Sequence, residues 1–390
     1  MNKLHVIFIA ALAITTGCRK SNVDNKDLRD FVQVNLVDNN GEYSATHKDP
    51  TLMNAWGLAF SSGGIPWVNS LGGHVSEVYT SEGAIARPPV NIPSPGDSVG
   101  GLPTGVVFAG GKGFRLPNGV AANFLFVGVD GILSGWNGPA GNNAFRLKNL
   151  SATSSFTGLA ISSWGTNNYI YAADFKGGKI AVWDTGFAKV NMSFRDAGIP
   201  SGYNPFNIQA IGTWLFVTYA KVGPDGKDQK GPGNGFVSIF NPDGSFVGRL
   251  ASRGPLNSPW GVAAAGGKFL DDNDMISDDS VDDHGGNRKG GSDNSGPGSS
   301  NSGRNGHDDN NHHLDSVVLV GNFGDGTINA YALNGKYVGK LQSHKRPIVI
   351  DGLWALSFAP TTSTVDQSRL YFTAGPDEEK DGLFGYLKKQ

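Results

Sequence analysis

The stretch from Val317 to Tyr331 reads V-V-L-V-G-N-F-G-D-G-T-I-N-A-Y, two short runs of β-branched and aromatic residues joined by Gly, Asn and Asp. Apolar runs of this length around an Asp-Gly turn are typical of a β-hairpin with a tight connection. The hairpin recurs along the chain in altered form. Repetition at a fixed interval predicts an architecture in which each unit packs on its neighbours.

Each hairpin follows a short strand that opens with a turn residue, usually with a Gly close by. Six such strands occur about 50 residues apart once one insertion is set aside, which is in the range of propeller blades. They are N-A-W-G-L-A-F at Asn54, P-T-G-V-V-F at Pro103, F-T-G-L-A-I at Phe156, P-F-N-I at Pro205, S-P-W-G-V-A at Ser258 and D-G-L-W-A-L at Asp351.

One strand-like run belongs to no unit. The last unit has no fourth, outer strand before Gln390, whereas F-V-Q-V-N-L from Phe31 to Leu36 stands alone. We predict that this run supplies the missing strand and closes the ring, leaving no long edge unpaired. The fold class is therefore all-β, a six-bladed β-propeller formed by residues 31–390 as one domain. A pair of β-sandwiches would explain neither the sixfold repeat nor the unpaired first strand.

Residues 1–18 have the features of an export signal, with Lys3 before an apolar run too short to span a bilayer. The end of this segment, T-T-G-C, resembles the lipobox of bacterial lipoproteins, with Thr15 in place of the usual Leu. Cys18 is the only cysteine, so we predict its lipidation, then a flexible tether over residues 19–30. The protein would be exported and anchored to a membrane of the bacterial cell envelope, facing the periplasm or the cell surface. An ordinary secretory signal is the alternative.

Residues 271–315 form an insertion in the fifth unit that is rich in Asp, Asn, Gly, Ser and His. It is almost free of apolar residues, so we predict a disordered loop. Its eleven Asp and four His suggest calcium or another divalent metal as an alternative, but their spacing matches no known metal loop. We expect no cofactor. The formal net charge of −2 argues against nucleic acid as a partner.

In a propeller, the loops before the innermost strands and the hairpins between the second and third strands share one face around the central channel. We predict a ring of polar groups there and select five as ligand-binding candidates: Asn54, Asn207, Asp351, Asp174 and Asn322. The long connection 221–235 lies on the same face, and its Lys221, Lys227 and Lys230 suit an anionic ligand. Trp56, Trp260 and Trp354 occupy a repeated position and favour packing between blades over a ligand platform.

Residues for catalysis are scarce. The chain has only Glu42, Glu77, Glu82, Glu378 and Glu379, none at the start of an innermost strand, and no G-x-S-x-G, H-E-x-x-H or phosphate-binding motif. We therefore predict no catalytic residues and a non-enzymatic module that binds a small molecule, glycan or protein at the channel mouth. The alternative is a metal-dependent hydrolase resembling lactonases, with Asn54, Asn207, Asp351 and Asp174 as ligands. A purely structural surface protein is a third hypothesis.

The body resembles a family of uncharacterised exported bacterial propeller proteins related to the NHL-repeat propellers. The resemblance covers about Phe31 to Gly385 except the insertion and implies the propeller fold and export, but no activity. It rests on N-A-W-G-L-A-F at Asn54, A-D-F-K-G-G-K-I-A-V-W-D at Ala173, P-F-N-I-Q-A-I-G at Pro205, G-P-G-N-G-F-V-S-I-F at Gly231, P-L-N-S-P-W-G-V-A at Pro255, G-N-F-G-D-G-T-I-N-A-Y at Gly321 and P-I-V-I-D-G-L-W-A-L-S-F at Pro347.

Overall fold

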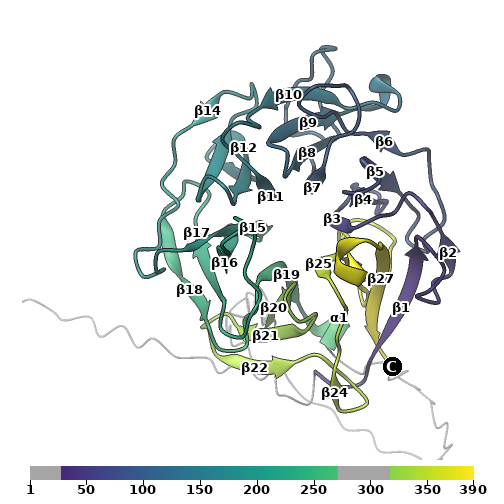
Figure 1. Ribbon diagram of the computed structural model, residues 1–390, viewed down its shortest axis with the longest axis vertical. Coiled ribbons are helices and arrows are strands. Elements are labelled where there is room, and N and C mark those ends of the chain that lie inside the picture. The colour runs from purple at the N-terminus through teal and green to yellow at the C-terminus, as the bar shows by residue number, and fades with distance from the viewer. Residues whose placement is uncertain (1–27, 271–316) are drawn as a thin grey trace, which may run out of the picture.

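Six antiparallel sheets surround a central axis like the blades of a propeller (Figure 1). The structure is a computed structural model and describes residues 28–270 and 317–390. The six-bladed β-propeller predicted from the repeat is therefore confirmed. The predicted signal segment, Cys18, most of the tether and the insertion 271–315 lie outside the described residues.

The blades follow one another in chain order, each with its first strand innermost. Blade 1 contains β3 (Ala55–Phe60), β4 (Pro66–Ser70), β5 (Val75–Val78) and β6 (Val90–Asn91); blade 2 contains β7 (Pro103–Phe108), β8 (Phe124–Gly128), β9 (Ile132–Trp136) and β10 (Phe145–Asn149). Blade 3 contains β11 (Phe156–Trp164), β12 (Asn167–Asp174), β13 (Lys179–Trp183) and β14 (Lys189–Val190).

The remaining blades follow the same plan. Blade 4 contains β15 (Tyr203–Ile211), β16 (Trp214–Lys221), β17 (Gly235–Phe240) and β18 (Phe246–Ser252); blade 5 contains β19 (Pro259–Ala265), β20 (Val317–Asn322), β21 (Ile328–Ala332) and β22 (Tyr337–Lys340). Blade 6 contains β25 (Leu353–Phe358), β26 (Leu370–Ala374), β27 (Leu383–Lys389) and β1 (Phe31–Asp38). Short elements outside this plan are β2 (His47–Lys48), β23 (Gln342–Ser343), β24 (Arg346–Pro347), η1 (Gly138–Ala140), α1 (Gly267–Leu270) and α2 (Pro376–Glu379).

The ring closes through β1, as the sequence predicted. β1 pairs antiparallel with β27 from Phe31 opposite Lys389 to Asp38 opposite Leu383. The ordered body begins three residues earlier than predicted: Leu28 is fully buried, and its carbonyl accepts a hydrogen bond from the N–H of Gln342. The last residues of the predicted tether therefore belong to the folded domain.

The glycines of the innermost strands explain the repeated signature. A Cβ on Gly57 would lie 2.1 Å from the carbonyl oxygen of Thr104 in the next blade, and one on Gly158 would lie 2.0 Å from Oδ1 of Asn207. Only glycine allows neighbouring blades to approach this closely near the axis. Among the described residues, buried apolar side chains form one cluster between each pair of adjacent blades and a further cluster on the axis.

Asp196 attaches the connection between β14 and β15 to the outer surface of blade 4. Its carboxylate accepts hydrogen bonds from Nε and Nη2 of Arg249 and from the Ser238 hydroxyl, and its side chain is 3% exposed. We expect Asp196→Ala to lower the free energy of unfolding by about 2 kcal/mol, because the guanidinium of Arg249 loses the carboxylate that accepts two of its hydrogen bonds. Urea unfolding measures the effect. Arg249→Lys keeps the charge without the fork and should lose about half as much; wild-type stability of Asp196→Ala would refute the role.

No helix within residues 28–270 and 317–390 is long and apolar enough to cross a membrane.

Candidate functional site

The centre of the propeller is filled by aromatic side chains. Trp354 is stacked between Trp56 and Phe323, with ring centroids 3.6 Å and 3.8 Å away. Trp260 and Phe206 approach the edge of Trp354 at 5.9 Å each. The tryptophans therefore pack across the axis, as favoured by their repeated position, but Trp56 and Trp354 also form the floor of a cavity.

This cavity, of about 260 Å³, lies at the mouth of the channel on the predicted face. Half of its lining residues are aromatic or aliphatic, and three charged residues come from two loops. The lining residues are Trp56, Leu71, Val129, Ser155, Thr157, Phe175, Phe206, Gly226, Lys227, Asp228, Trp354 and Glu379. We refer to it as the mouth pocket.

Glu379 is held in the mouth pocket by a chain of hydrogen bonds that starts at the aromatic floor. The indole N–H of Trp354 donates to Oδ1 of Asn54 at 2.8 Å, and Nδ2 of Asn54 donates to Oε2 of Glu379 at 2.9 Å. Burial raises the pKa of Glu379, whereas the Asn54 hydrogen bond and the charges of Lys230 and Lys227 oppose this rise. Asn54, a predicted site residue, thus orients a carboxyl group that was not among the predicted site residues.

α2 presents Glu379 through an uncommon backbone conformation. Asp377, Glu378 and Glu379 all have left-handed φ angles, of 50°, 55° and 68°. Such a run of non-glycine residues costs free energy and needs support from its surroundings. Asp351 gives part of that support, since its Oδ2 accepts the N–H of Asp377 at 3.1 Å. Asp351 is exposed and does not line the pocket; it holds the turn that does.

The long connection between β16 and β17 reaches the mouth pocket, as predicted. It contributes Gly226, Lys227 and Asp228 to the lining. Burial raises the pKa of Asp228, and the positive charge of Lys230 opposes this. Lys230 lies over the ring of Phe323, with Nζ 4.0 Å from the ring centroid, which is a cation–π contact. Two carboxyl groups and two lysines therefore gather above the aromatic floor.

The predicted polar ring has mainly a different use: it links the blades. The side-chain amide of Asn69 donates to the backbone carbonyls of Thr104 and Gly105. The hydroxyl of Thr104 donates to the backbone carbonyl of Phe156. Asn207 donates to the carbonyl of Trp260 at 2.9 Å. Buried carbonyls between blades need such partners because water cannot reach them.

The other predicted residues are also buried and lie outside the pocket lining. Asn322 donates to the carbonyl of Pro255 and accepts the N–H of Asn257. Asp174 accepts the N–H groups of Ser155 and Gly177, at 3.1 Å and 2.8 Å. Since Ser155 lines the mouth pocket, Asp174 positions one of its walls. Direct ligand contact by Asn207, Asn322, Asp351 and Asp174 stays a prediction without geometric support.

The four residues named as ligands of the alternative metal-dependent hydrolase hydrogen-bond to protein groups. Asn54, Asn207, Asp351 and Asp174 each have a separate partner, as described above. Among residues 28–270 and 317–390, no group of three or more His, Cys, Asp or Glu side chains is arranged to hold a metal ion. The metal-dependent hydrolase stays a prediction.

A repeated signal for the pocket was present in the sequence. The residue that follows the second strand of blades 1 to 5 is apolar and points to the axial cluster: Leu71, Val129, Phe175, Val222 and Phe323. In blade 6 this position is Gly375, where a Cβ would lie 2.2 Å from Oδ1 of Asn54. The exception marks the blade that carries Glu379. No local motif indicates that α2 turns inward.

Comparison with known proteins finds relatives over nearly the whole chain. Uncharacterized protein L690 of Acanthamoeba polyphaga mimivirus is 32% identical over 374 residues, which cover 92% of this chain and 86% of the relative. Uncharacterized protein R648 of the same virus is 30% identical over 372 residues, or 92% and 80%. No family model matches. These relatives are viral, so the exported bacterial family suggested by the resemblance stays a prediction.

Among solved structures, a streptogramin B lyase has a TM-score of 0.46 and 11% identity, covering 91% of this chain and 97% of the lyase. The virginiamycin B lyase of Staphylococcus aureus has a TM-score of 0.40 and 12% identity, covering 85% and 80%. Likeness at this level carries no information about the ligand or reaction of this chain.

Proposed function

The chain belongs to the family of the mimivirus proteins L690 and R648, and we propose that this member is a non-enzymatic propeller that binds a neutral glycan at its channel mouth. The observation that carries the proposal is the mouth pocket, in which aromatic walls meet Glu379, Asp228 and Lys227. Its volume of about 260 Å³ lies just below the usual range for drug-sized ligands, which favours one ring-sized unit.

The polar groups of the pocket favour a neutral ligand with many hydroxyls. Two carboxyl groups, Asp228 and Glu379, face two lysines, Lys227 and Lys230, so their formal charges balance. The same groups supply donors and acceptors in several directions. A sugar matches this combination, because its hydroxyls bind such groups and its apolar ring face packs on aromatic side chains.

The indole N–H of Trp56 supports a ligand that accepts a hydrogen bond. Trp56 lines the pocket and is 5% exposed, and its Nε1 has no hydrogen-bond partner among the described residues. Buried donors are nearly always paired in native proteins. A hydroxyl oxygen of a bound sugar would satisfy this donor.

The test compares two adjacent glutamates of α2. Tryptophan fluorescence and calorimetry would follow binding of a panel of neutral mono- and disaccharides to the full chain. We expect Glu379→Ala to weaken binding at least tenfold, since hydrogen bonds to carboxylates contribute about 1.5–3 kcal/mol. Glu378→Ala is the matched control: its side chain is 88% exposed, its φ is also left-handed, and binding should change less than about twofold.

Two results would contradict the proposal. One is the absence of binding by every member of the panel at about 10 mM, a concentration at which even weak specific sites are occupied. The other is equal loss of affinity in Glu378→Ala and Glu379→Ala. That result would mean that the conformation of the turn matters for binding but the Glu379 carboxyl group does not contact the ligand. Turnover of a bound glycan that Glu379→Gln abolishes would replace the binding module by an enzyme.

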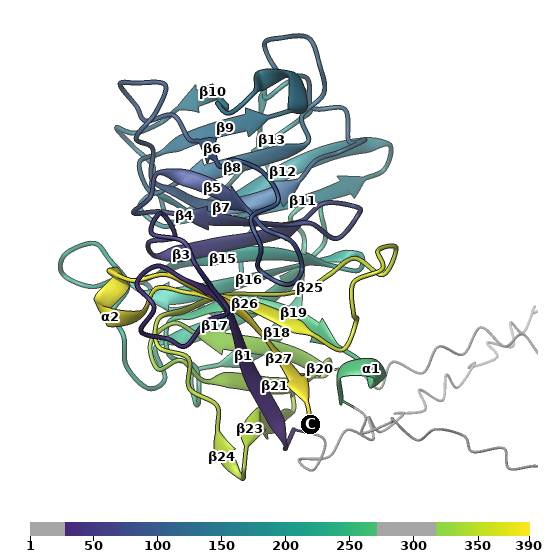
Figure 2. The ribbon, with the colours of Figure 1, turned by 90° about the vertical axis from the view of Figure 1, so that its right-hand side faces the viewer.

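The predicted lipid anchor at Cys18 is part of the same proposal and fits the orientation of the domain. α1 and α2 lie on opposite faces of the ring (Figure 2). Phe31 stacks on Phe269 of α1 at 4.7 Å, and Leu28 belongs to the same core cluster. The chain therefore enters the body on the face opposite Glu379. An anchor at Cys18 would therefore join the body on the face opposite the mouth pocket. We expect Cys18→Ser to lose membrane attachment, as followed by fractionation of expressing cells; unchanged attachment would contradict the anchor.

A further inference from the structure

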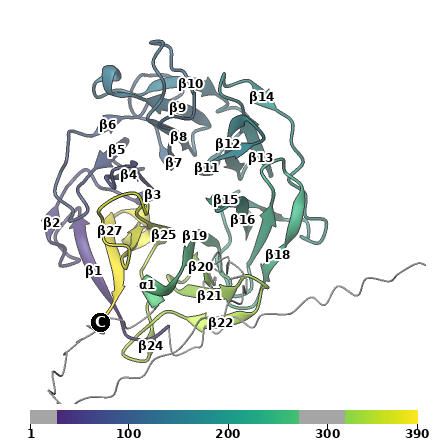
Figure 3. The ribbon, with the colours of Figure 1, turned by 180° about the vertical axis from the view of Figure 1, so that it is seen from behind.

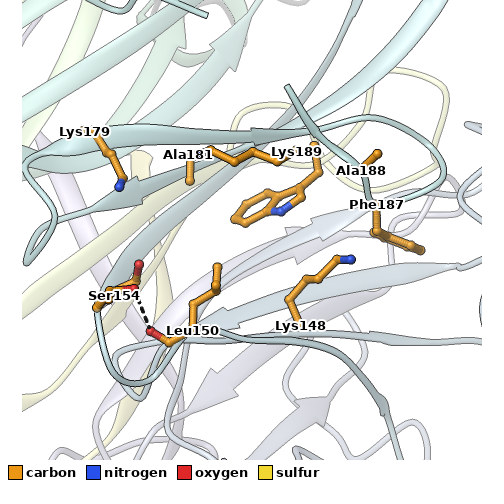
Figure 4. Close-up of a pocket in the computed structure, with 10 residues that line it drawn as sticks. Lys148, Leu150, Ser154, Lys179, Ala181, Phe187, Ala188 and Lys189 are labelled. Atoms are coloured by element: carbon orange, nitrogen blue, oxygen red, sulfur yellow. Dashed lines mark hydrogen bonds between the residues drawn. The ribbon is translucent and has the colours of Figure 1, made fainter. Parts of the chain in front are cut away.

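A second cavity, of about 280 Å³, is lined by residues of blades 2 and 3 (Figure 4). Figure 3 shows the strands β10 and β14 of these blades at the outer side of the ring. One wall comes from β10 and the connection after it, and the other from β13, β14 and the turn between them. The lining residues are Lys148, Leu150, Thr153, Ser154, Lys179, Ala181, Trp183, Phe187, Ala188 and Lys189. We refer to it as the lateral pocket.

The lateral pocket combines an apolar floor with an excess of positive charge. Trp183 and Phe187 are 3% and 6% exposed. Figure 4 shows Lys179 toward one end of the pocket and Lys148 beside Phe187 at the other. The lining contains three lysines and no carboxyl group, and among the described residues none of the three forms an ion pair.

An acidic residue next to the pocket, Asp184, is engaged with the backbone. Asp184 stands in the turn between β13 and β14, and its Oδ1 accepts the N–H groups of Gly186 and Ala188, each at 2.9 Å. Its carboxylate thus shapes the turn rather than pairing with a lysine. None of the five ion pairs among the described residues involves a lysine of the pocket, although Asp174 stands opposite Lys179 in the β12–β13 register.

The shortness of β14 keeps this surface open. β14 pairs with only two residues of β13, through Val182 with Val190 and Trp183 with Lys189. The outer edge of β13 from Lys179 to Ala181 therefore has no strand beside it. A shallow groove of about 410 Å³ continues along this edge and shares Lys179, Ala181 and Lys189 with the lateral pocket. Together they form an elongated site.

Phe187 closes the site despite an unfavourable backbone. Its φ is 59°, a conformation that glycine adopts freely and a bulky residue rarely does. Its ring lies 5.7 Å from that of Phe114 and forms the wall beside Ala188. The turn thus has an aromatic residue at a position where glycine would adopt the same backbone conformation with less strain.

We propose that the lateral pocket binds a small amphipathic carboxylate, a medium-chain fatty acid. The acyl chain lies along Leu150, Ala181 and Trp183 and continues into the groove, and the carboxylate meets the lysines at the rim. The site and the ligand match in shape and in charge. The elongated apolar floor packs against the acyl chain, and the lysines at the rim attract the carboxylate at its end. This site is separate from the mouth pocket, and the proposal does not depend on the glycan.

The experiment uses octanoate and its uncharged counterpart 1-octanol as probes in calorimetric titrations of the full chain. We expect octanoate to bind with one-to-one stoichiometry and 1-octanol to bind at least tenfold more weakly. Replacing Lys148, Lys179 and Lys189 together by Gln should weaken octanoate binding at least tenfold. The matched control replaces the exposed Lys268, Lys336 and Lys345 by Gln, with the same change of net charge, and should bind within twofold of wild type.

A variant that fills the pocket separates the site from the charge. Ala181→Phe keeps all three lysines and occupies the floor, so octanoate binding should be lost while the circular dichroism spectrum is unchanged. The proposal is overturned if octanoate does not bind wild type, if 1-octanol binds equally well, or if both triple variants lose affinity alike. Undiminished octanoate binding by a folded Ala181→Phe would overturn it as well.

Discussion

Trp354→Ala is expected to lower the free energy of unfolding by about 4 kcal/mol, among the largest effects of any single substitution in this chain. Trp354 is 1% exposed and stacks between Trp56 and Phe323. Removing the indole opens a cavity on the axis, where the six blades converge and the surroundings cannot collapse. It also leaves Oδ1 of Asn54 without its donor.

Trp164→Ala supplies the matched control, because Trp164 is 47% exposed at the end of β11. The same chemical change there should cost less than about 1 kcal/mol. Urea unfolding at one pH measures both variants. Equal losses would mean that the axial stack does not contribute more than a surface tryptophan. Trp354→Phe, which keeps one stacked ring and loses the N–H, should fall between wild type and Trp354→Ala.

Glu77 is expected to make the protein less stable as the pH rises from about 4.5 to about 7. Burial, and to a smaller extent the charge of Asp49, raise the pKa of Glu77 from 4.5 to about 7, although a hydrogen bond with Thr51 opposes the shift. Oγ1 of Thr51 lies 2.6 Å from both Oδ1 of Asp49 and Oε1 of Glu77. A hydroxyl donates only one proton, so Thr51 cannot donate to both carboxylates at once, and its hydrogen bond only partly offsets the cost of burying an ionised Glu77.

The sign follows from proton binding. Between these pH values the folded state holds a proton that the unfolded chain has released, so its stabilising contribution is complete below pH 4.5 and is lost by about pH 7. The difference corresponds to about 3 kcal/mol. Glu77→Gln should match wild type near pH 4.5 and exceed it by about this amount at pH 8.

The control for Glu77→Gln is Glu42→Gln, the same change at an exposed position. Its difference from wild type should stay constant across the pH range. Urea unfolding of wild type, Glu77→Gln and Glu42→Gln between pH 4.5 and 8 measures these differences. A Glu77→Gln difference that does not grow with pH would show that the folded state keeps Glu77 ionised without cost.

The architecture could be predicted because its determinants are local and repeated. The hairpin at 317–331 and the innermost strands carry their own turn and packing signals, and glycines such as Gly57 mark the close contact of neighbouring blades. Ring closure by β1 followed from counting strands. None of these features depends on which side chains meet across the axis.

The site was harder to predict because its residues come together only when the ring has closed. Asn54, from blade 1, meets Glu379, from blade 6, across 325 positions of sequence. Asn207 and Asn322 lie at the ends of strands, where a polar side chain is expected to be accessible to a ligand. In the folded protein both side chains instead hydrogen-bond to backbone groups. The loop that carries Lys227 could be identified from its length; the inward turn of α2 could not.

The most direct test of the account is to locate a bound glycan among the tryptophans. The chain has eight tryptophans, and ¹⁹F NMR of the 5-fluorotryptophan protein reports on each. Addition of a neutral disaccharide that binds should shift the signals of Trp56 and Trp354, which line the mouth pocket, and leave those of the exposed Trp164 and Trp214 in place. Saturable shifts confined to other tryptophans, or none with any member of the panel, would contradict a glycan site at the channel mouth.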